Sequence, residues 1–286
     1  MLTQEIFADR KEMERLRVQS RLLTPCESPV IARLLDGKSG MKILDLGCNN
    51  GEKTHRYFST PAVSRVLGLE FSSSLAEKAQ QLYGDHIFRF YSCDCGSASA
   101  EPNIRALMAR CGIESFDIIY LSFVLMHLPA AESVLTMLSG LLAPGGVLLI
   151  AEPYDDGSFL SGEGAALLRE FLSILGRDLY AGNRSLGAVI PAMLERSGYL
   201  WQMENETIGA RPGETQKKQD IYTTFFTYLE DDLAILMRDE PENESYRRDA
   251  AWLADKLPQL RSAILRDDTE ISMGFRILTA RRRDDA

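Results

Sequence analysis

The chain has few basic residues and no long hydrophobic run. Its 32 Lys and Arg are outnumbered by 41 Asp and Glu among 286 residues, which gives a formal net charge of −9 and a pI near 5. This balance argues against a broad binding surface for nucleic acid or an anionic membrane. No apolar run reaches the ~20 residues that a membrane-spanning helix needs. The charged N-terminus also lacks the apolar centre of a signal peptide. We therefore expect a cytoplasmic protein without nucleic-acid or membrane partners.

Cysteine and histidine are also too few for some common sites. The five cysteines are odd in number and lack the spacing of a disulfide framework, as is usual in a reducing compartment. Cys93 and Cys95 have no second pair of Cys or His to complete a zinc site, which uses three or four protein ligands. We expect no bound metal. The histidine candidates for proton transfer are His55, His86 and His127.

The sequence does contain a regular alternation of strand-like and helix-like segments. Short apolar runs typical of buried strands occur near 42–46, 66–70, 87–91, 117–121 and 146–151. Segments with helical spacing separate them, near 52–59, 74–82, 102–111 and 131–142. This alternation predicts an α/β fold with right-handed crossovers and a mostly parallel sheet covered on both faces. "LAPGG" at 142–146 is expected to be a turn just before the fifth strand.

The remaining segments predict additions to this core. The N-terminal arm is expected to hold a charged helix and a second short helix near 28–35. Helices near 161–177 and 187–196 and a strand near 200–208 continue the core. A long helical stretch follows, and the alternating "EISMGFRILTA" predicts a final strand. We divide the chain into a helical arm, a core, a helical cap insertion and a last core strand with its tail: 1–40, 41–210, 211–269 and 270–286.

The first strand runs into a turn that resembles three kinds of nucleotide-binding loop. In "ILDLGCNNGEKT" (43–54), a phosphate loop would need glycine where Glu52 stands, and a carboxylate there would repel the phosphates. The dinucleotide fingerprint would need glycine at Asn49 and a small residue at Glu52. Neither pattern fits. An acidic loop that contains glycine suits a cationic ligand better than a phosphate.

The segment Asp45 to Gly51 resembles motif I of the class I S-adenosylmethionine-dependent methyltransferases, an acidic residue followed by x-G-x-G-x-G. Asn49 stands at the middle glycine, and asparagine tolerates left-handed backbone angles better than most residues. Later segments resemble further motifs of this family in the same order: "GLEFS" (68–72), "YSCDC" (91–95), "FDIIYLSFVLMHL" (116–128) and "LLAPGGVLLIAEP" (141–153). The resemblance implies a Rossmann-like methyltransferase sheet of seven strands. Its last strand, near 271–280, would be antiparallel and lie between strands five and six.

The resemblance also implies which residues bind the adenosine half of S-adenosylmethionine. Glu70, at the end of strand two, would accept hydrogen bonds from both ribose hydroxyls, and Phe71 would lie against the adenine. Asp94 would accept from the adenine amino group, with the backbone of Cys95 at the ring edge. The alternatives left open are a solvated surface position for Glu70, simple packing in the core for Phe71 and an ordinary turn for Asp94.

The methionyl half would lie at motif I and the end of strand four. Asp45 would anchor the methionyl ammonium, and Gly47 would let the methionyl part approach the backbone closely. Cys48 is assigned to the same loop, and Leu121 and Ser122 would lie beside the sulfonium. The motifs offer no cationic partner for the methionyl carboxylate, so we expect Arg15 or Gln19 of the arm to reach it. The arm and the insertion would then close together over the site. A solvated charged helix is the alternative for the arm.

Little of the chemistry is visible in the sequence. Methyl transfer is an in-line displacement, so the enzyme mainly aligns the reactants and excludes water. His127, just past strand four, could act as a base, or could be an ordinary histidine at a helix entry; Glu152 and Tyr154 are equally placed. The cap carries an aromatic stripe at Tyr222, Phe225 and Phe226, more often packing than a pocket wall. If it lines the pocket, an aromatic or apolar acceptor is favoured.

We therefore predict methyl transfer from S-adenosylmethionine to a small-molecule acceptor, with the methylated atom undetermined. Two alternatives stay open. One is a catalytically silent S-adenosylmethionine-binding regulator or partner subunit, because Asn49 departs from motif I and no base is evident. The other is a protein methyltransferase. A nucleic-acid acceptor is disfavoured by the charge and by "LSFV" where an Asn-Pro-Pro-Tyr-like motif would stand. The sequence does not predict an oligomeric state.

Overall fold

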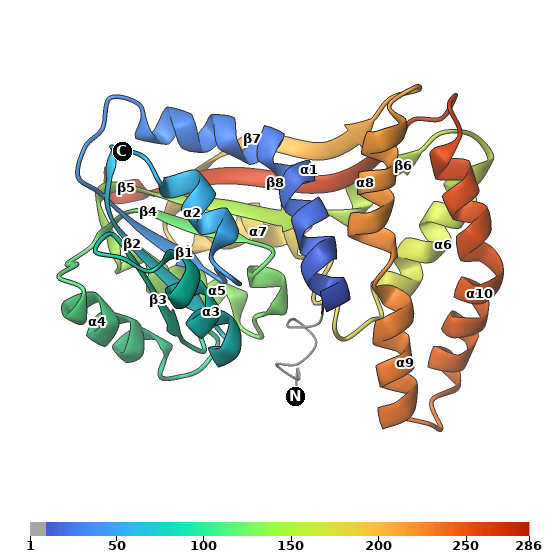
Figure 1. Cartoon of the computed structure of the whole chain (residues 1–286), viewed down its shortest axis with the longest axis horizontal. Helices are drawn as coiled ribbons and strands as arrows, with labels where there is room; N and C mark the ends of the chain where they lie inside the picture. The colour runs from blue at the N-terminus through green and yellow to red at the C-terminus, as the bar shows by residue number, and fades with distance from the viewer. Residues whose placement is uncertain (1–9, 286) are drawn as a thin grey trace.

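A single mixed sheet forms the centre of the protein (Figure 1). The computed structural model describes residues 10–285, so the first nine residues of the predicted arm and Ala286 lie outside the described residues. The strands are β1 (Met41–Leu46), β2 (Val63–Glu70), β3 (Phe88–Ser92), β4 (Phe116–Ser122), β5 (Leu142–Pro153), β6 (Phe159–Leu160), β7 (Tyr199–Ala210) and β8 (Ile271–Arg282). Their order is β3-β2-β1-β4-β5-β8-β6, with β7 paired to β8. The first five strands are mutually parallel, which confirms the predicted α/β fold.

The last strand lies where the family resemblance placed it. β8 pairs antiparallel with β5 on one side and antiparallel with β7 on the other. The predicted number of seven strands is wrong, because the described sheet has eight. The additional one is the two-residue β6, which pairs with Ile271 and Ser272 of β8 just beyond the end of β5.

Helices cover both faces of the sheet, and each face has its own apolar layer. The helices of the core are α2 (Glu52–Phe58), α3 (Ser73–Tyr83), α4 (Ala100–Arg110), α5 (Ala131–Ser139), α6 (Ala165–Leu175) and α7 (Leu186–Arg196). The insertion forms α8 (Thr215–Phe226), α9 (Leu229–Asp239) and α10 (Glu244–Leu265), which confirms its helical character. Its apolar side chains continue the layer under α1 (Arg10–Leu35). None of the helices described here is long and apolar enough to cross a membrane.

The arm departs from prediction. Two helices were expected, but α1 is one continuous helix that contains Pro25 and Pro29. A proline inside a helix removes one backbone hydrogen bond and usually breaks the helix. Tertiary packing outweighs this here, because Leu22 and Leu23 before the prolines and Val30 and Ile31 after them are all buried in the core.

The "LAPGG" segment is also not the predicted turn. It belongs to β5, which starts at Leu142. The pairing with β4 shifts register between Leu142, opposite Phe116, and Val147, opposite Ile118. Gly145 takes a positive φ of 71° within this irregular stretch, so the glycine is accommodated as a bulge in the strand.

Candidate active site

A cavity of about 530 Å³ opens where β1, β2 and β4 end. The motif loops line one side, and α1, α8 and the start of α9 line the other. Such a position, at the carboxyl ends of parallel strands, is the usual ligand site of open α/β sheets. Eleven of the predicted site residues line it: Arg15, Gln19, Asp45, Gly47, Cys48, Glu70, Phe71, Asp94, Cys95, Ser122 and His127. Leu121 does not, because its side chain is fully buried in the apolar layer on one face of the sheet.

The motif I loop has the backbone that its residues predict. Asn49 adopts a positive φ of 50°, so it occupies the left-handed region where the family motif has glycine. Gly47 has a φ of 76°, and a Cβ there would lie 2.4 Å from Cγ2 of Val124. The loop therefore needs glycine at position 47, both for its backbone angle and for its close contact with the segment after β4.

Glu70 holds two loops together and faces the cavity. Its Oε2 accepts from the backbone N–H of Asn49 at 2.9 Å, and its Oε1 accepts from the N–H of Ser72 at 3.0 Å. Burial raises the pKa of this carboxyl, and the backbone N–H groups partly offset that. A carboxylate has about four acceptor positions, so two remain for a ligand with paired hydroxyls. The arrangement fits the ribose of the predicted cofactor.

The neighbouring side chains fit an adenine. Phe71 is 45% exposed although it is a large apolar residue, and it lines the cavity beside Glu70. Asp94 accepts from the N–H of Gly96 at 3.0 Å, which fixes its turn. Cys95 is buried, and its thiol donates to the carbonyl of Cys93 at 3.7 Å.

Asp45 is buried under the loop. The hydroxyl of Thr54, in α2, donates to its Oδ2 at 2.5 Å. Burial raises the pKa of Asp45 to about 7, while the Thr54 hydrogen bond and the nearby Lys53 lower it. This geometry agrees with a role for Asp45 in anchoring the loop to the helix that follows it.

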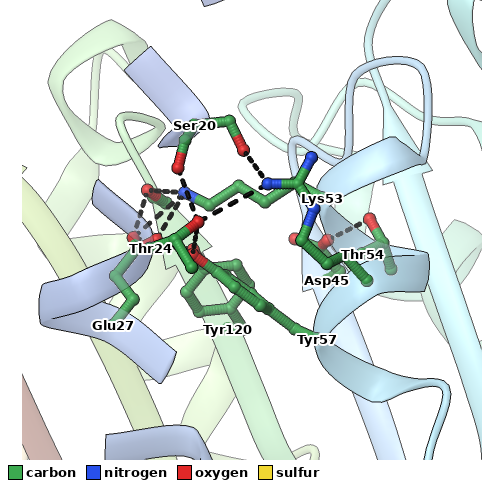
Figure 2. A network of polar contacts seen from close by, with 10 residues as sticks. Ser20, Thr24, Glu27, Asp45, Lys53, Thr54, Tyr57 and Tyr120 are labelled. Carbon is green, nitrogen blue, oxygen red and sulfur yellow. Dashed lines mark hydrogen bonds and ion pairs between the residues drawn. The ribbon is translucent and has the colours of Figure 1, made fainter. Parts of the chain in front are cut away.

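A buried carboxylate of α1 joins the arm to α2 and to the end of β4 (Figure 2). The Glu27 side chain is fully buried, and its oxygens lie 3.0 and 2.8 Å from the ammonium of Lys53. The hydroxyls of Tyr57 and Tyr120 donate to it at 2.7 and 2.8 Å. The Ser122 hydroxyl also bonds to Glu27, at 2.9 Å, and to Lys53, at 2.9 Å. Burial, with the carboxylate, raises the pKa of both tyrosines.

At the far end of the cavity, the arm meets the insertion. The guanidinium of Arg15 donates to Glu12 at 2.6 and 2.7 Å and to the carbonyl of Thr224 at 2.8 Å. It also lies 4.8 Å from the centre of the Tyr228 ring. Arg21 and Asp220 form a second link between the two segments, at 2.8 and 3.0 Å. Arg15 is thus directed toward the insertion, and its predicted contact with the methionyl carboxylate stays a prediction, as does that of Gln19.

The aromatic stripe of the insertion divides between packing and the cavity. Phe225 of the stripe lines the cavity, together with Tyr228, which follows the stripe in the sequence. Tyr222 and Phe226 instead stack on each other with ring centres 5.5 Å apart, and Phe226 packs 4.6 Å from Phe171. The stripe therefore serves both as packing and as part of the pocket wall, the two alternatives that the sequence left open.

His127 lies in the 3-10 helix η2 (Leu125–His127) beside the cavity. Burial lowers its pKa to about 4, with further lowering from the charges of Arg184 and Arg15. A general base works best with a pKa near the operating pH. His127 is therefore well placed but only weakly basic.

Glu152 and Tyr154 are occupied by structural contacts. Glu152 accepts from the N–H groups of Val124 and Leu125 at 2.8 and 2.7 Å, so it fixes the turn after β4. Burial raises its pKa to about 7. The ring of Tyr154 lies 3.6 Å from the guanidinium carbon of Arg276.

The cavity wall includes charged groups that the sequence analysis did not assign to the site, among them Lys53, Arg184 and Asp232. Arg184, in the loop before α7, donates to both carboxylate oxygens of Asp155 at 2.6 and 2.9 Å. In the sequence, Lys53 was considered only as part of a phosphate loop. The other two look like ordinary charged residues of a turn and a helix end, and no local pattern marks them.

Comparison with known proteins agrees with this architecture. Residues 37–229, more than half of the chain, match the family described as "Methyltransferase domain". The trans-aconitate 2-methyltransferase of Methylobacterium radiotolerans is 30% identical over 146 residues, which cover 50% of this chain and 46% of that protein. The ubiquinone biosynthesis O-methyltransferase of Pasteurella multocida is 31% identical over 136 residues, 45% of this chain and 53% of that one. The chain thus spans about half the length of these curated relatives.

Solved structures share the fold at low identity. The phosphoethanolamine N-methyltransferase 2 of Haemonchus contortus, in complex with S-adenosyl-L-methionine, has a TM-score of 0.52 and 14% identity, covering 99% of this chain and 60% of that one. The cyclase SpnF has a TM-score of 0.51 and 18% identity, covering 89% and 80%. These likenesses concern the fold alone. The family match confirms what the resemblance of motif I implied. The chain belongs to the methyltransferase domain family.

Proposed function

We propose that this protein transfers the methyl group of S-adenosylmethionine to a small-molecule acceptor. The observation that carries this proposal is the Glu70 carboxylate, which is fixed by the backbone of Asn49 and Ser72 and keeps acceptor positions toward the cavity. Phe71 and Asp94 flank it as the surfaces for adenine. The bound sulfonium supplies a methyl group that is already activated for attack by a nucleophile.

The tasks left to the protein are alignment and exclusion of water. Gly47 allows the methionyl chain to approach the backbone, and Asp45 holds the loop in place. Ser122 presents its hydroxyl at the end of β4, fixed by Glu27 and Lys53. For the methionyl carboxylate we add Lys53 to the arm candidates Arg15 and Gln19, because its ammonium lies close enough to Asp45 to lower the pKa of that group.

A small acceptor is supported by the cover over the cavity. Residues of α1, α8 and α9 form its far wall, and the arm and insertion are joined there by Arg15 and Arg21. Phe225 and Tyr228 supply an aromatic surface for part of the acceptor.

The test combines binding and transfer. Calorimetry with S-adenosylmethionine should show that Glu70→Ala binds at least about 10-fold more weakly, because each lost charge-assisted bond is worth about 1.5–3 kcal/mol, or roughly 10- to 150-fold. Glu77→Ala, on the exposed side of α3, is the matched control and should bind as the wild type does. Formation of S-adenosylhomocysteine in the presence of a small-molecule extract should require Glu70. Equal affinity of a folded Glu70→Ala protein would refute the assignment.

A further inference from the structure

Arg184 is held against the segment that follows β4, where methyl transfer is expected. The N–H of Asn183 donates to the carbonyl of Met126 at 2.7 Å. Gly182 has a φ of 73°, and a Cβ there would lie 2.8 Å from that carbonyl and 2.9 Å from Nδ1 of His127. The loop can take this path only with glycine at 182. Arg184 is thereby placed beside His127 on the cavity wall.

The guanidinium of Arg184 is buried, and only one edge of it is satisfied. The side chain is 4% exposed. Nε and Nη2 donate to Asp155, which is not part of the cavity lining. Among residues 10–285, no hydrogen bond is made by Nη1, which leaves its two donors for a group in the cavity. Buried arginines normally have their donors satisfied, so this edge indicates a ligand.

The charges around this wall favour an anion. The pKa of His127 is lowered mainly by burial and further by the charges of Arg184 and Arg15. Glu12 pairs with Arg15, and Asp155 pairs with Arg184 from behind. A further acid on the wall is Asp232, whose pKa is raised by burial and by the neighbouring Asp178; Glu152 lies near Arg184 behind the wall. Burial and the closeness of the two acids disfavour a negative charge on both Asp232 and Asp178. On the cavity side, the Nη1 edge of Arg184 is left without a hydrogen-bond partner among residues 10–285.

A positively charged acceptor group fits this wall poorly. Two guanidinium groups would repel it, and Arg15, 4.8 Å from the ring centre, already takes up the cation-binding position on one face of Tyr228. A carboxylate, by contrast, matches the planar fork of an arginine through two parallel hydrogen bonds.

We propose that the methyl acceptor carries a carboxylate and that Arg184 binds this carboxylate through its cavity-facing edge. This inference rests on the proposed function and names the substrate class of the same site. Arg184 is a binding residue for the acceptor, and the cofactor half of the cavity does not depend on it.

The experiment divides a deproteinised cell extract into anionic, cationic and neutral fractions before the reaction. Each fraction is incubated with the protein and S-adenosylmethionine labelled in the methyl group. The wild type should transfer label to the anionic fraction. The double variant Arg184→Met/Asp155→Asn removes both members of the buried pair, so that no lone charge is left inside. It should transfer label at least 100-fold more slowly at low acceptor concentration, with unchanged affinity for S-adenosylmethionine.

Two further variants separate recognition from folding. Arg184→Lys keeps the positive charge and loses the planar guanidinium. It should transfer label at least tenfold faster than the double variant, through a lower KM for the acceptor. Arg177→Met is the matched control, because Arg177 makes the same two-bond pair with Asp249, at 2.6 and 3.3 Å, but is 48% exposed and outside the cavity. It should transfer label as the wild type does.

The outcomes separate this inference from the proposed function. Transfer to the cationic or neutral fraction by the wild type would overturn the carboxylate and leave methyl transfer intact. Unchanged transfer to the anionic fraction by the folded double variant would overturn the role of Arg184. Transfer to no fraction would refute the proposed function itself, and this inference with it.

Discussion

At the cofactor end of the cavity, Glu70 is fixed by backbone N–H groups of adjoining loops. At the acceptor end, Arg15 is fixed by the Glu12 side chain of its own helix and by the Thr224 carbonyl, and Arg184 is fixed by the Asp155 side chain. The backbone contacts at Glu70 survive many substitutions, because every residue except proline has an N–H. The contacts at Arg15 and Arg184 depend on particular carboxylates, Glu12 and Asp155. The first end can therefore be shared widely within a fold, whereas the second can change with the substrate.

The largest expected effect concerns the network that joins the arm to the cofactor end. Lys53→Met would leave the fully buried Glu27 without its cationic partner. Removal of one partner of a buried pair typically destabilises by about 3–5 kcal/mol. Urea unfolding should show this loss, and the double variant Glu27→Gln/Lys53→Met should recover part of it. Lys78→Met, on the exposed side of α3, is the control. An unchanged midpoint for Lys53→Met would show that the network does not hold the arm.

A second pair of variants tests the backbone of the cofactor end. Gly47 and Gly37 have similar positive φ values, 76° and 65°, but a Cβ at Gly37 would meet nothing within 4 Å. Alanine at either position costs about 1–2 kcal/mol for the left-handed backbone. The contact with Val124 should add about 1–3 kcal/mol for Gly47→Ala. Calorimetry should show weaker S-adenosylmethionine binding for Gly47→Ala alone. Equal losses of unfolding free energy for Gly47→Ala and Gly37→Ala would contradict the steric argument.

The turn at the acceptor end should respond to pH through Glu152. Its pKa is raised from 4.5 to about 7 by burial, so the folded protein binds more protons than the unfolded chain between these values. The contribution of Glu152 to stability therefore falls as pH rises through that window, and the full penalty is present above about pH 7. Relative to the wild type, Glu152→Gln should gain stability on the order of 3 kcal/mol between these limits, at about 1.4 kcal/mol for each unit of pKa. Urea unfolding at a series of pH values measures the difference, and a constant difference would contradict the sign.

The smallest expected effect is a change in local opening. If the arm and insertion close together on the ligand, S-adenosylhomocysteine with a product analogue should slow hydrogen exchange in 10–22 and 220–230 together. A roughly three- to tenfold slowing corresponds to at most about 1.4 kcal/mol. Protection confined to 45–51 and to the neighbourhoods of Glu70 and Asp94 would show that the arm is only a scaffold.

The sequence predicted the parts of the molecule in which neighbours along the chain are also neighbours in space. The strand–turn–helix unit at Asp45 to Gly51 is local, so its left-handed Asn49 and its place beside Glu70 could be inferred from the motif. The antiparallel β8 followed from the family resemblance, and its alternating pattern is local too.

Residues whose role depends on distant partners could not be predicted. Glu27 stands between two prolines and resembles a linker residue, yet its partners Lys53 and Tyr120 are 26 and 93 residues away. Arg184 meets Asp155 from 29 residues away. Charged side chains are normally solvated, so only the packing of the whole chain reveals that these groups are buried.

The position of β8 has a consequence for the order of synthesis. β7 and β5 never pair with each other in the described sheet, because the last strand lies between them. While the ribosome is still adding the insertion, the edge of β5 and the whole of β7 have unsatisfied backbone groups. The first four strands can form a partial sheet earlier. The half of the core next to the insertion becomes complete only when residues 271–282 emerge. A ribosome that stalls within α10 therefore leaves a chain with open strand edges, which are prone to aggregation.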